Sequence, residues 1–215
     1  MTATESRSAV APTRQSRRAS RRSGSASRVL SAAAGLLLVG GAMAMQTLDL
    51  SDGELSAPLT YTGAKGETVD ARRYTVRLDS FAAAKSIQDD DGTIGTDNLF
   101  LIVNASAKSS LKPYHLGHPV LVTADDKKFD ATDRVDTTDT LANTWVQPDI
   151  WVSGRFFFEV PASALPGARV VFRLPPQAGL QEPYQPEVEV DLGLDEEAAR
   201  KLAASPQDVY STVKK

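Results

Sequence analysis

The stretch IWVSGRFFFEV, residues 150–160, decides the fold. It is rich in aromatic and β-branched residues, which favour strands because they pack well on a half-buried pleated surface. Pro161 ends the run, since proline cannot donate to a strand ladder. Gly154, inside the run, predicts a β-bulge. The sequence therefore predicts the strongest strand of the body here.

Shorter runs of the same kind lie on both sides of this strand. Residues 74–81 alternate between polar and apolar, and residues 99–105 are apolar almost throughout, as in a central strand. The remaining runs are residues 120–123, 128–131, 169–174 and 187–192. Turn residues separate the runs, and no βαβ rhythm is present. This spacing predicts an all-β fold, an antiparallel immunoglobulin-like sandwich of seven to eight strands over residues 67–193.

A short helix is predicted after the sandwich, within residues 194–215. Asp195 is its N-cap, and the two acidic residues that follow suit the positive end of the helix dipole. Pro206 stops the helix, because a proline interrupts the helical hydrogen bonds. The tail from Gln207 is expected to fray.

An uncharged segment precedes the body. Residues 29–48 read VLSAAAGLLLVGGAMAMQTL and contain no charged residue. A helix of 20 residues is about 30 Å long, the thickness of a bilayer's hydrocarbon core. This segment therefore predicts one transmembrane helix through which the chain contacts the membrane.

Charge sets the expected orientation of that helix. Residues 1–28 carry seven arginines against one glutamate, whereas three acidic residues occur at 49–54. Positive residues stay on the cytoplasmic side, so we expect a single-pass cell-membrane protein with a disordered basic head inside and the body outside. Residues 49–66 contain proline and glycine and predict a linker with one short strand at 59–62.

A second interpretation of the uncharged segment stays open. Ala42-Met43-Ala44 is a small-residue cleavage pattern after an apolar run, as in a secretory signal peptide. In that case the body would be a cleaved, secreted protein instead of an anchored one.

Composition excludes several function classes for the body. Residues 29–215 contain 17 Lys and Arg against 26 Asp and Glu, a net charge of −9, which disfavours binding to nucleic acid. The chain has no cysteine, so disulfides, thiol catalysis and zinc–thiolate sites are excluded. No G-x-S-x-G motif accompanies the two histidines, His115 and His118, which we expect in a solvent-facing loop. We expect no enzyme activity and no cofactor.

Two loops carry candidate ligands. Asp89-Asp90-Asp91-Gly92 resembles the start of a calcium loop, but Ile87 and Asn98 stand where an EF-hand needs its first and last ligands. Asp89, Asp91 and Asp97 therefore remain only as candidates for an extracellular calcium site, the alternative being a solvated loop.

A second polar segment, at residues 130–149, is the candidate partner-binding surface. Asp133 and Asp136 belong to a run in which aspartate recurs every third residue, and loops at the end of a sandwich commonly bind partners. Trp145 and Trp151 flank Pro148, and we expect one in the core and the other as an exposed anchor for a protein or glycan. Trp145, Asp133 and Asp136 are thus the predicted partner-binding residues.

Three stretches together resemble a known family. They are NLFLIVNASA (98–107), the hairpin at 120–131, and Gln147-Pro148 leading through Gly154-Arg155 into FFFEVP (156–161). These resemble the telokin-like, immunoglobulin-like extracellular domains of unknown function found behind a signal or anchor in Gram-positive bacteria. The resemblance covers residues 67–192 and implies a sandwich outside the membrane without enzyme activity. Asp149 stands where that family has a glycine after the proline, so the turn is expected to differ.

The predicted function is that of a membrane-anchored, extracytoplasmic binding or accessory module of the cell envelope, without catalytic activity. Its partner would be an envelope protein or a wall polymer. Two alternatives stay open. In one, the chain is a subunit of an envelope transporter or secretion complex, assembled through its membrane helix. In the other, it is a cleaved secreted protein, including the case of a secreted hydrolase.

Overall fold

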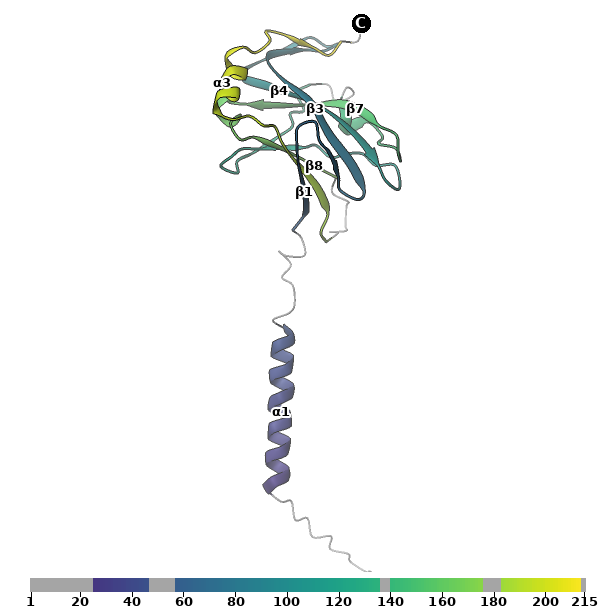
Figure 1. Cartoon of the computed structure of the whole chain (residues 1–215), viewed down its shortest axis with the longest axis vertical. Coiled ribbons are helices and arrows are strands. Elements are labelled where there is room, and N and C mark those ends of the chain that lie inside the picture. Colours follow the sequence, from purple (N-terminus) through teal and green to yellow (C-terminus); the bar gives the residue numbers. More distant parts are fainter. Residues whose placement is uncertain (1–24, 47–56, 136–139, 176–182, 214–215) are drawn as a thin grey trace, which may run out of the picture. The chain divides into compact units, whose positions relative to one another are not determined.

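The computed structural model describes residues 25–46, 57–135, 140–175 and 183–213. The chain divides into two compact units, Met1–Leu50 and Ser51–Lys215 (Figure 1). The first unit contains α1 (Ser25–Gln46). Of the helices in the described ranges, none has the length and the apolar character that a membrane crossing requires. A helix thus forms where one was predicted, but the transmembrane span at residues 29–48 is not shown.

The second unit is a sandwich of two five-stranded sheets, and this confirms the predicted β-sandwich. Sheet A has the order β1 (Leu59–Ala64), β9 (Pro186–Asp191), β8 (Arg169–Arg173), β5 (Val120–Val122), β6 (Lys128–Asp130). Sheet B has the order β10 (Tyr210–Ser211), β3 (Tyr74–Gln88), β4 (Thr93–Ser109), β7 (Val152–Val160), with β2 (Thr68–Asp70) paired to β3. The predicted helix after the last long strand is also present as α3 (Glu196–Ala204).

The long β3–β4 hairpin forms the centre of sheet B. β4 lies between β3 and β7, as its apolar run predicts, and pairs with both in antiparallel register. Alternate residues such as Leu78, Leu101 and Phe158 are buried in the main core together with side chains of sheet A. Tyr74, at the start of β3, crosses the interior, and its hydroxyl donates to the Phe172 carbonyl of β8 (2.9 Å). This bond ties one sheet to the other.

A second, smaller core covers the outer face of sheet B near the β3–β4 turn. Its members include Phe100, Ile102 and Phe157, which point away from the main core. Val135 packs on them from the segment after β6, and Tyr210 packs on them from the C-terminal segment. Two stretches outside the long strands are therefore held against this sheet by apolar burial.

Two pairs of strands are parallel, which corrects the expectation of a purely antiparallel sandwich. β1 forms where one short strand was predicted at 59–62, and it pairs with β9, so the sandwich begins at Leu59 and not at residue 67. β10 pairs with β3, and the backbone N–H of Thr212 donates to the Gln88 carbonyl (2.8 Å). The expectation of a frayed tail is wrong for residues 207–212, because backbone hydrogen bonds and Tyr210 hold them on sheet B.

The bulge predicted at Gly154 is also absent from the β4–β7 ladder, whose register runs without a shift. The glycine is needed for space. A Cβ at Gly154 would lie 2.8 Å from the Cβ of Leu141, in the 3-10 helix η2 (Leu141–Asn143). η2 therefore packs directly on the backbone of β7.

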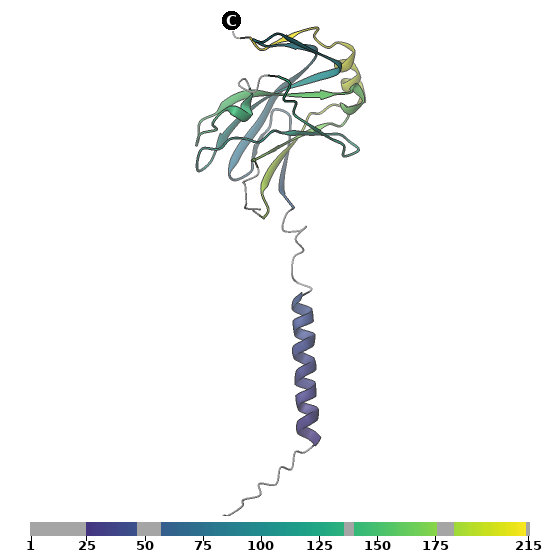
Figure 2. The same ribbon diagram turned by 180° about the vertical axis from the view of Figure 1, so that it is seen from behind.

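The two ends of the sandwich are distinct. β3 runs from Tyr74 at one end to Gln88 at the other. The chain enters β1 at the Tyr74 end, because the Tyr74 hydroxyl also donates to Pro186, the residue paired with Leu59. The C-terminal segment lies at the Gln88 end (Figure 1, Figure 2).

Candidate functional site

An open groove lies at the Gln88 end of the sandwich, between the β3–β4 turn and the segment after β6. Its volume is about 560 Å³. The lining residues are Asp89, Asp91, Gly92, Thr93, Ile94, Asp133, Arg134 and Val135. We call this the acidic groove, because three aspartates line it against one arginine.

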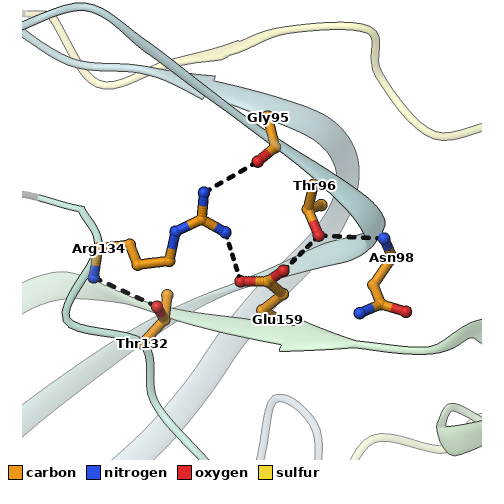
Figure 3. A network of polar contacts seen from close by, with 6 residues as sticks. All are labelled: Gly95, Thr96, Asn98, Thr132, Arg134 and Glu159. Carbon is orange, nitrogen blue, oxygen red and sulfur yellow. Dashed lines mark hydrogen bonds and ion pairs between the residues drawn. The ribbon is translucent and has the colours of Figure 1, made fainter.

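The segment that forms one wall of the groove is fixed in place. The Thr132 N–H donates to the Phe157 carbonyl of β7 (2.7 Å), and Val135 is buried in the second core. Between them, the Arg134 guanidinium donates to the carboxylate of Glu159 (2.7 Å) and to the Gly95 carbonyl (3.1 Å) (Figure 3). Part of the polar segment at residues 130–149 is therefore docked on the sheet.

Glu159 connects this wall to the start of β4. Its second carboxylate oxygen accepts from the Thr96 hydroxyl, whose oxygen in turn accepts from the Asn98 N–H (3.0 Å) (Figure 3). The Thr96 hydroxyl, followed by Arg134, holds the pKa of Glu159 below its ordinary value, although partial burial opposes the shift. The Glu159 carboxylate is thus held ionised, and it positions Arg134 at the groove.

The opposite wall is a tight turn organised by Asp89. One of its carboxylate oxygens accepts from the N–H groups of Asp91 (3.1 Å) and Gly92 (3.0 Å). Gly92 has a φ of 150°, which a residue with a side chain rarely adopts. Asp89 is buried, whereas Asp91 is exposed at the rim. The structural role of Asp89 is therefore to hold the turn.

The calcium candidates are only partly brought together. Asp89 and Asp91 line the groove, but Asp97 lies outside it. Within the described ranges, no three His, Cys, Asp or Glu side chains gather closely enough to hold a metal ion.

The three predicted partner-binding residues are separated in the structure. Asp133 is exposed and lines the groove. Asp136 lies outside the described residues. Trp145 is near the other end of the sandwich, where Val146 pairs with Tyr114.

Both tryptophans are exposed, so the expectation that one belongs to the core is wrong. Trp145 is 55% exposed, and its ring lies 3.9 Å from that of His115. His115 is half-buried and Nδ1 lies 3.1 Å from the Ala142 carbonyl, whereas His118 is exposed as expected. Trp151 is 40% exposed, with Arg77 at 5.3 Å from its ring centre.

Sequence reasoning missed Arg134 and Glu159, the pair that builds the groove wall. They stand 25 residues apart and share no motif. The available signal was Val135, an apolar residue in a polar run, which pointed to a segment that docks on the body.

Comparison with known proteins adds no assignment of function. No family model matches the chain, and no curated protein matches it. The YjhA protein of Bacillus subtilis is 14% identical, with a TM-score of 0.47 over 60% of this chain and 98% of its own. An uncharacterised β-sandwich protein of Clostridium difficile is 10% identical, with a TM-score of 0.40 over 63% of this chain and 95% of its own. MPT63, a secreted protein of Mycobacterium tuberculosis, is 10% identical, with a TM-score of 0.42 over 63% of this chain and 98% of its own.

All three TM-scores lie below 0.5, so the assignment to a β-sandwich rests on the strand pairing and the two cores of this chain. The finer assignment to the telokin-like, immunoglobulin-like class stays a prediction.

Proposed function

We propose that this protein is an extracytoplasmic binding module of the cell envelope, exported by the α1 segment and without catalytic activity. The α1 segment either stays as an anchor or is removed by cleavage after the Ala42-Met43-Ala44 pattern. The sandwich then presents the acidic groove to a partner in the envelope.

The observation that carries the export proposal is the character of α1. Leu36, Leu37, Leu38 and Val39 are consecutive and all exposed. Successive residues are rotated by about 100° around a helix, so these four point to every side. This one turn of α1 is therefore apolar all round and has no polar face, unlike a turn of an ordinary surface helix. With six arginines before it and Arg28 in its first turn, this is the pattern of a segment handled by the export machinery.

The groove supports the binding role. Its walls come from separate stretches of the chain, the turn at 89–94 and the segment at 133–135, and both are pinned by hydrogen bonds. Pre-organised walls lower the entropic cost of binding. The Arg134 guanidinium already contacts Glu159 and Gly95, so the aspartates dominate the charge of the groove. A cationic segment of an envelope protein is the complementary partner.

Export is tested by placing a protease-cleavable tag after Lys215 and treating intact cells with protease. We expect loss of the tag and a sandwich outside the cytoplasmic membrane. Changing Arg17, Arg18, Arg21 and Arg22 to Glu should block export. Changing the same four residues to Lys keeps the positive charge, so export should be retained. A protected tag in the wild type would refute the proposal. The mass of the mature chain then separates anchor from cleaved signal.

Partner binding is tested with a photo-crosslinking residue at Asp133. We expect a crosslinked envelope component that disappears when Asp91 is changed to Asn. The matched control carries the crosslinker at Lys201, which is exposed on α3. Equal crosslinking from both positions would show that the groove has no special role.

A further inference from the structure

The Tyr74 end of the sandwich carries most of its exposed apolar side chains. Of the eight large apolar residues exposed on the described part of the sandwich, only Val209 and Val213 lie at the Gln88 end. The other six are Leu59, Leu111, Trp145, Ile150, Trp151 and Tyr184. Apolar side chains that gather on a surface mark a place that a partner covers.

Backbone hydrogen bonds join three loops at this end into one surface. The Ser110 N–H donates to the Arg73 carbonyl (3.0 Å). The Ser109 N–H donates to the Gln147 carbonyl, and the Asp149 N–H donates to the Ser109 carbonyl (both 3.1 Å). The three loops are residues 71–73, 108–112 and 145–151, which we call the basic aromatic end.

The charge of this surface is opposite to that of the body. The three loops contain four cations and one acid, in a body whose net charge from residue 29 onward is −9. The cations are Arg72, Arg73, Lys108 and Lys112, and the acid is Asp149. A positive patch on a negative domain is complementary to a negative surface and is screened by salt.

The tips of two loops are aliphatic. Leu111 is 79% exposed and Ile150 is 59% exposed. Aliphatic groups flanked by lysine and tryptophan suit the boundary between lipid headgroups and acyl chains, where tryptophan rings also gather. An anionic sugar polymer offers no apolar phase for these tips.

The ring environments also favour lipid over sugar. Arg77 and Lys108 lie 5.3 Å and 5.6 Å from the centre of the Trp151 ring. His115 packs on the Trp145 ring. A sugar would need an uncovered ring face to stack on, whereas insertion at a lipid boundary needs only the exposed ring edge.

The chain enters the sandwich at the same end. Leu59, the first residue of β1, pairs with Pro186, which accepts from the Tyr74 hydroxyl. Any tether formed by the residues before β1 therefore joins the sandwich at this end.

We propose that the basic aromatic end docks on an anionic lipid bilayer, with Leu111 and Ile150 inserted at the acyl boundary and the lysines and arginines on the headgroups. This inference rests on the proposed export of the chain. The acidic groove, at the Gln88 end, then faces away from the membrane.

Tryptophan emission of the full chain tests this contact directly. Trp145 and Trp151 are the only two tryptophans in the protein, and both belong to the surface. The chain is reconstituted in phosphatidylcholine vesicles with or without 30% phosphatidylglycerol, with lipids brominated on their acyl chains as quenchers. We expect a blue shift and quenching in the anionic vesicles only, lost when NaCl is raised from about 0.05 to 0.5 M.

Two variants with the same chemical change separate this surface from a general charge effect. In the double variant Ile150→Asp with Lys112→Glu, the lipid concentration that gives half-maximal quenching should rise at least about tenfold. Val209→Asp with Lys85→Glu makes the equivalent change at the Gln88 end and should behave as the wild type. Circular dichroism verifies that both variants are folded.

Three outcomes would overturn the proposal. The first is no tryptophan quenching in anionic vesicles, and the second is an equal loss of quenching in both double variants. The third is a blue shift of tryptophan emission when soluble polyglycerol phosphate replaces the vesicles. The last would assign the surface to a wall polymer. A tag exposed outside the cell with unquenched tryptophans would refute lipid docking and leave the export proposal standing. A tag kept in the cytoplasm would refute export, whatever the vesicles show.

Discussion

At the scale of single residues, Tyr74 shows how a buried polar group can join two sheets. Its ring lies in the main core, yet its hydroxyl donates to carbonyls of β8 and β9. Burial, with the charge of Glu187 adding to it, raises the pKa of the Tyr74 phenol. The folded protein therefore holds this proton more tightly than the unfolded chain does.

We expect Tyr74→Phe to lower the free energy of unfolding by about 1–3 kcal/mol, because buried carbonyls lose their donor. The stability that the raised pKa provides is full below about pH 10 and is lost as pH rises further. The wild type should therefore weaken between pH 8 and pH 10.5 more than the variant. Urea unfolding at both pH values measures this. Tyr184→Phe, at an exposed site, is the control, and an equal loss in it would contradict the role of Tyr74.

Gly154 shows a close approach that no strand pattern reveals. A Cβ there would lie 2.8–2.9 Å from Leu141 atoms, most of them backbone atoms of η2. We expect Gly154→Ala to cost about 1–3 kcal/mol of unfolding free energy, through overpacking. Gly95→Ala, with no atom near the added Cβ, should change stability by less than about 0.5 kcal/mol. Equal effects in thermal unfolding would show that η2 moves aside freely.

Residue-scale prediction from sequence fails where a role depends on distant neighbours. Gly154 predicts a bulge within its own strand, but Leu141 lies thirteen positions away and gives the real reason. Asp149 replaces the expected glycine, yet its φ of 57° is the left-handed conformation that a glycine would supply. Aspartate tolerates that conformation better than most residues, so the sequence change need not alter the turn.

At the scale of elements, the Arg134–Glu159 contact fixes the segment after β6 on sheet B. Arg134 comes from that segment, Glu159 from β7, and Thr96 from β4. Val135, which is buried in the second core, directly follows Arg134, which makes the polar contact, so both interactions hold the same segment. The groove wall is therefore an element in its own right, although it contains no helix or strand.

We expect a double-mutant cycle of Arg134→Met and Glu159→Gln to give a coupling of about 0.5–1 kcal/mol, since the arginine side chain is 46% exposed and solvent screens the pair. Because the pKa of Glu159 is lowered, its contribution is present above about pH 4.5 and is lost as pH falls below that. Urea unfolding at pH 7 and pH 4 measures both. The exposed Lys85–Asp208 pair is the control and should couple near zero. A coupling at pH 4 as large as at pH 7 would contradict this.

Elements with a sustained apolar pattern were predictable, whereas the parallel pairing of the short terminal strands was not. β4 and β7 are recognisable in the sequence by their long apolar runs. These runs are apolar because each strand packs into a core on both of its faces near the β3–β4 turn. β10 has two residues, too few for any periodicity, and its place depends on Ile87 and Gln88 of β3. β1 reads LTYTGA and was predicted as one short strand at 59–62 within a linker, but nothing in its sequence indicates that it pairs with β9.

At the scale of the whole sandwich, the two ends differ in charge and in exposed chemistry. The acidic groove lies at the Gln88 end, and the basic aromatic end lies where the chain enters β1. The order of strands explains this separation. β3 and β4 span the sandwich, so the turn between them lies at one end and their outer ends lie at the other. The proposed membrane contact and the proposed partner site therefore lie at opposite ends of the sandwich.

The last prediction concerns which terminal stretch the sandwich needs. Every buried residue of the described chain lies between Val69 and Thr212. Removing residues 1–50 should leave the midpoint of thermal unfolding within about 2 °C of the full chain. Removing residues 207–215 deletes Tyr210 from the second core together with the hydrogen bonds to β3. A loss of about 2–3 kcal/mol there lowers the midpoint by about 5–10 °C in a domain of this size. The much shorter C-terminal deletion should therefore be the more damaging one. Differential scanning calorimetry of the three chains in one detergent buffer measures this, and the reverse order of midpoints would show that the N-terminal unit, not the C-terminal strand, completes the fold.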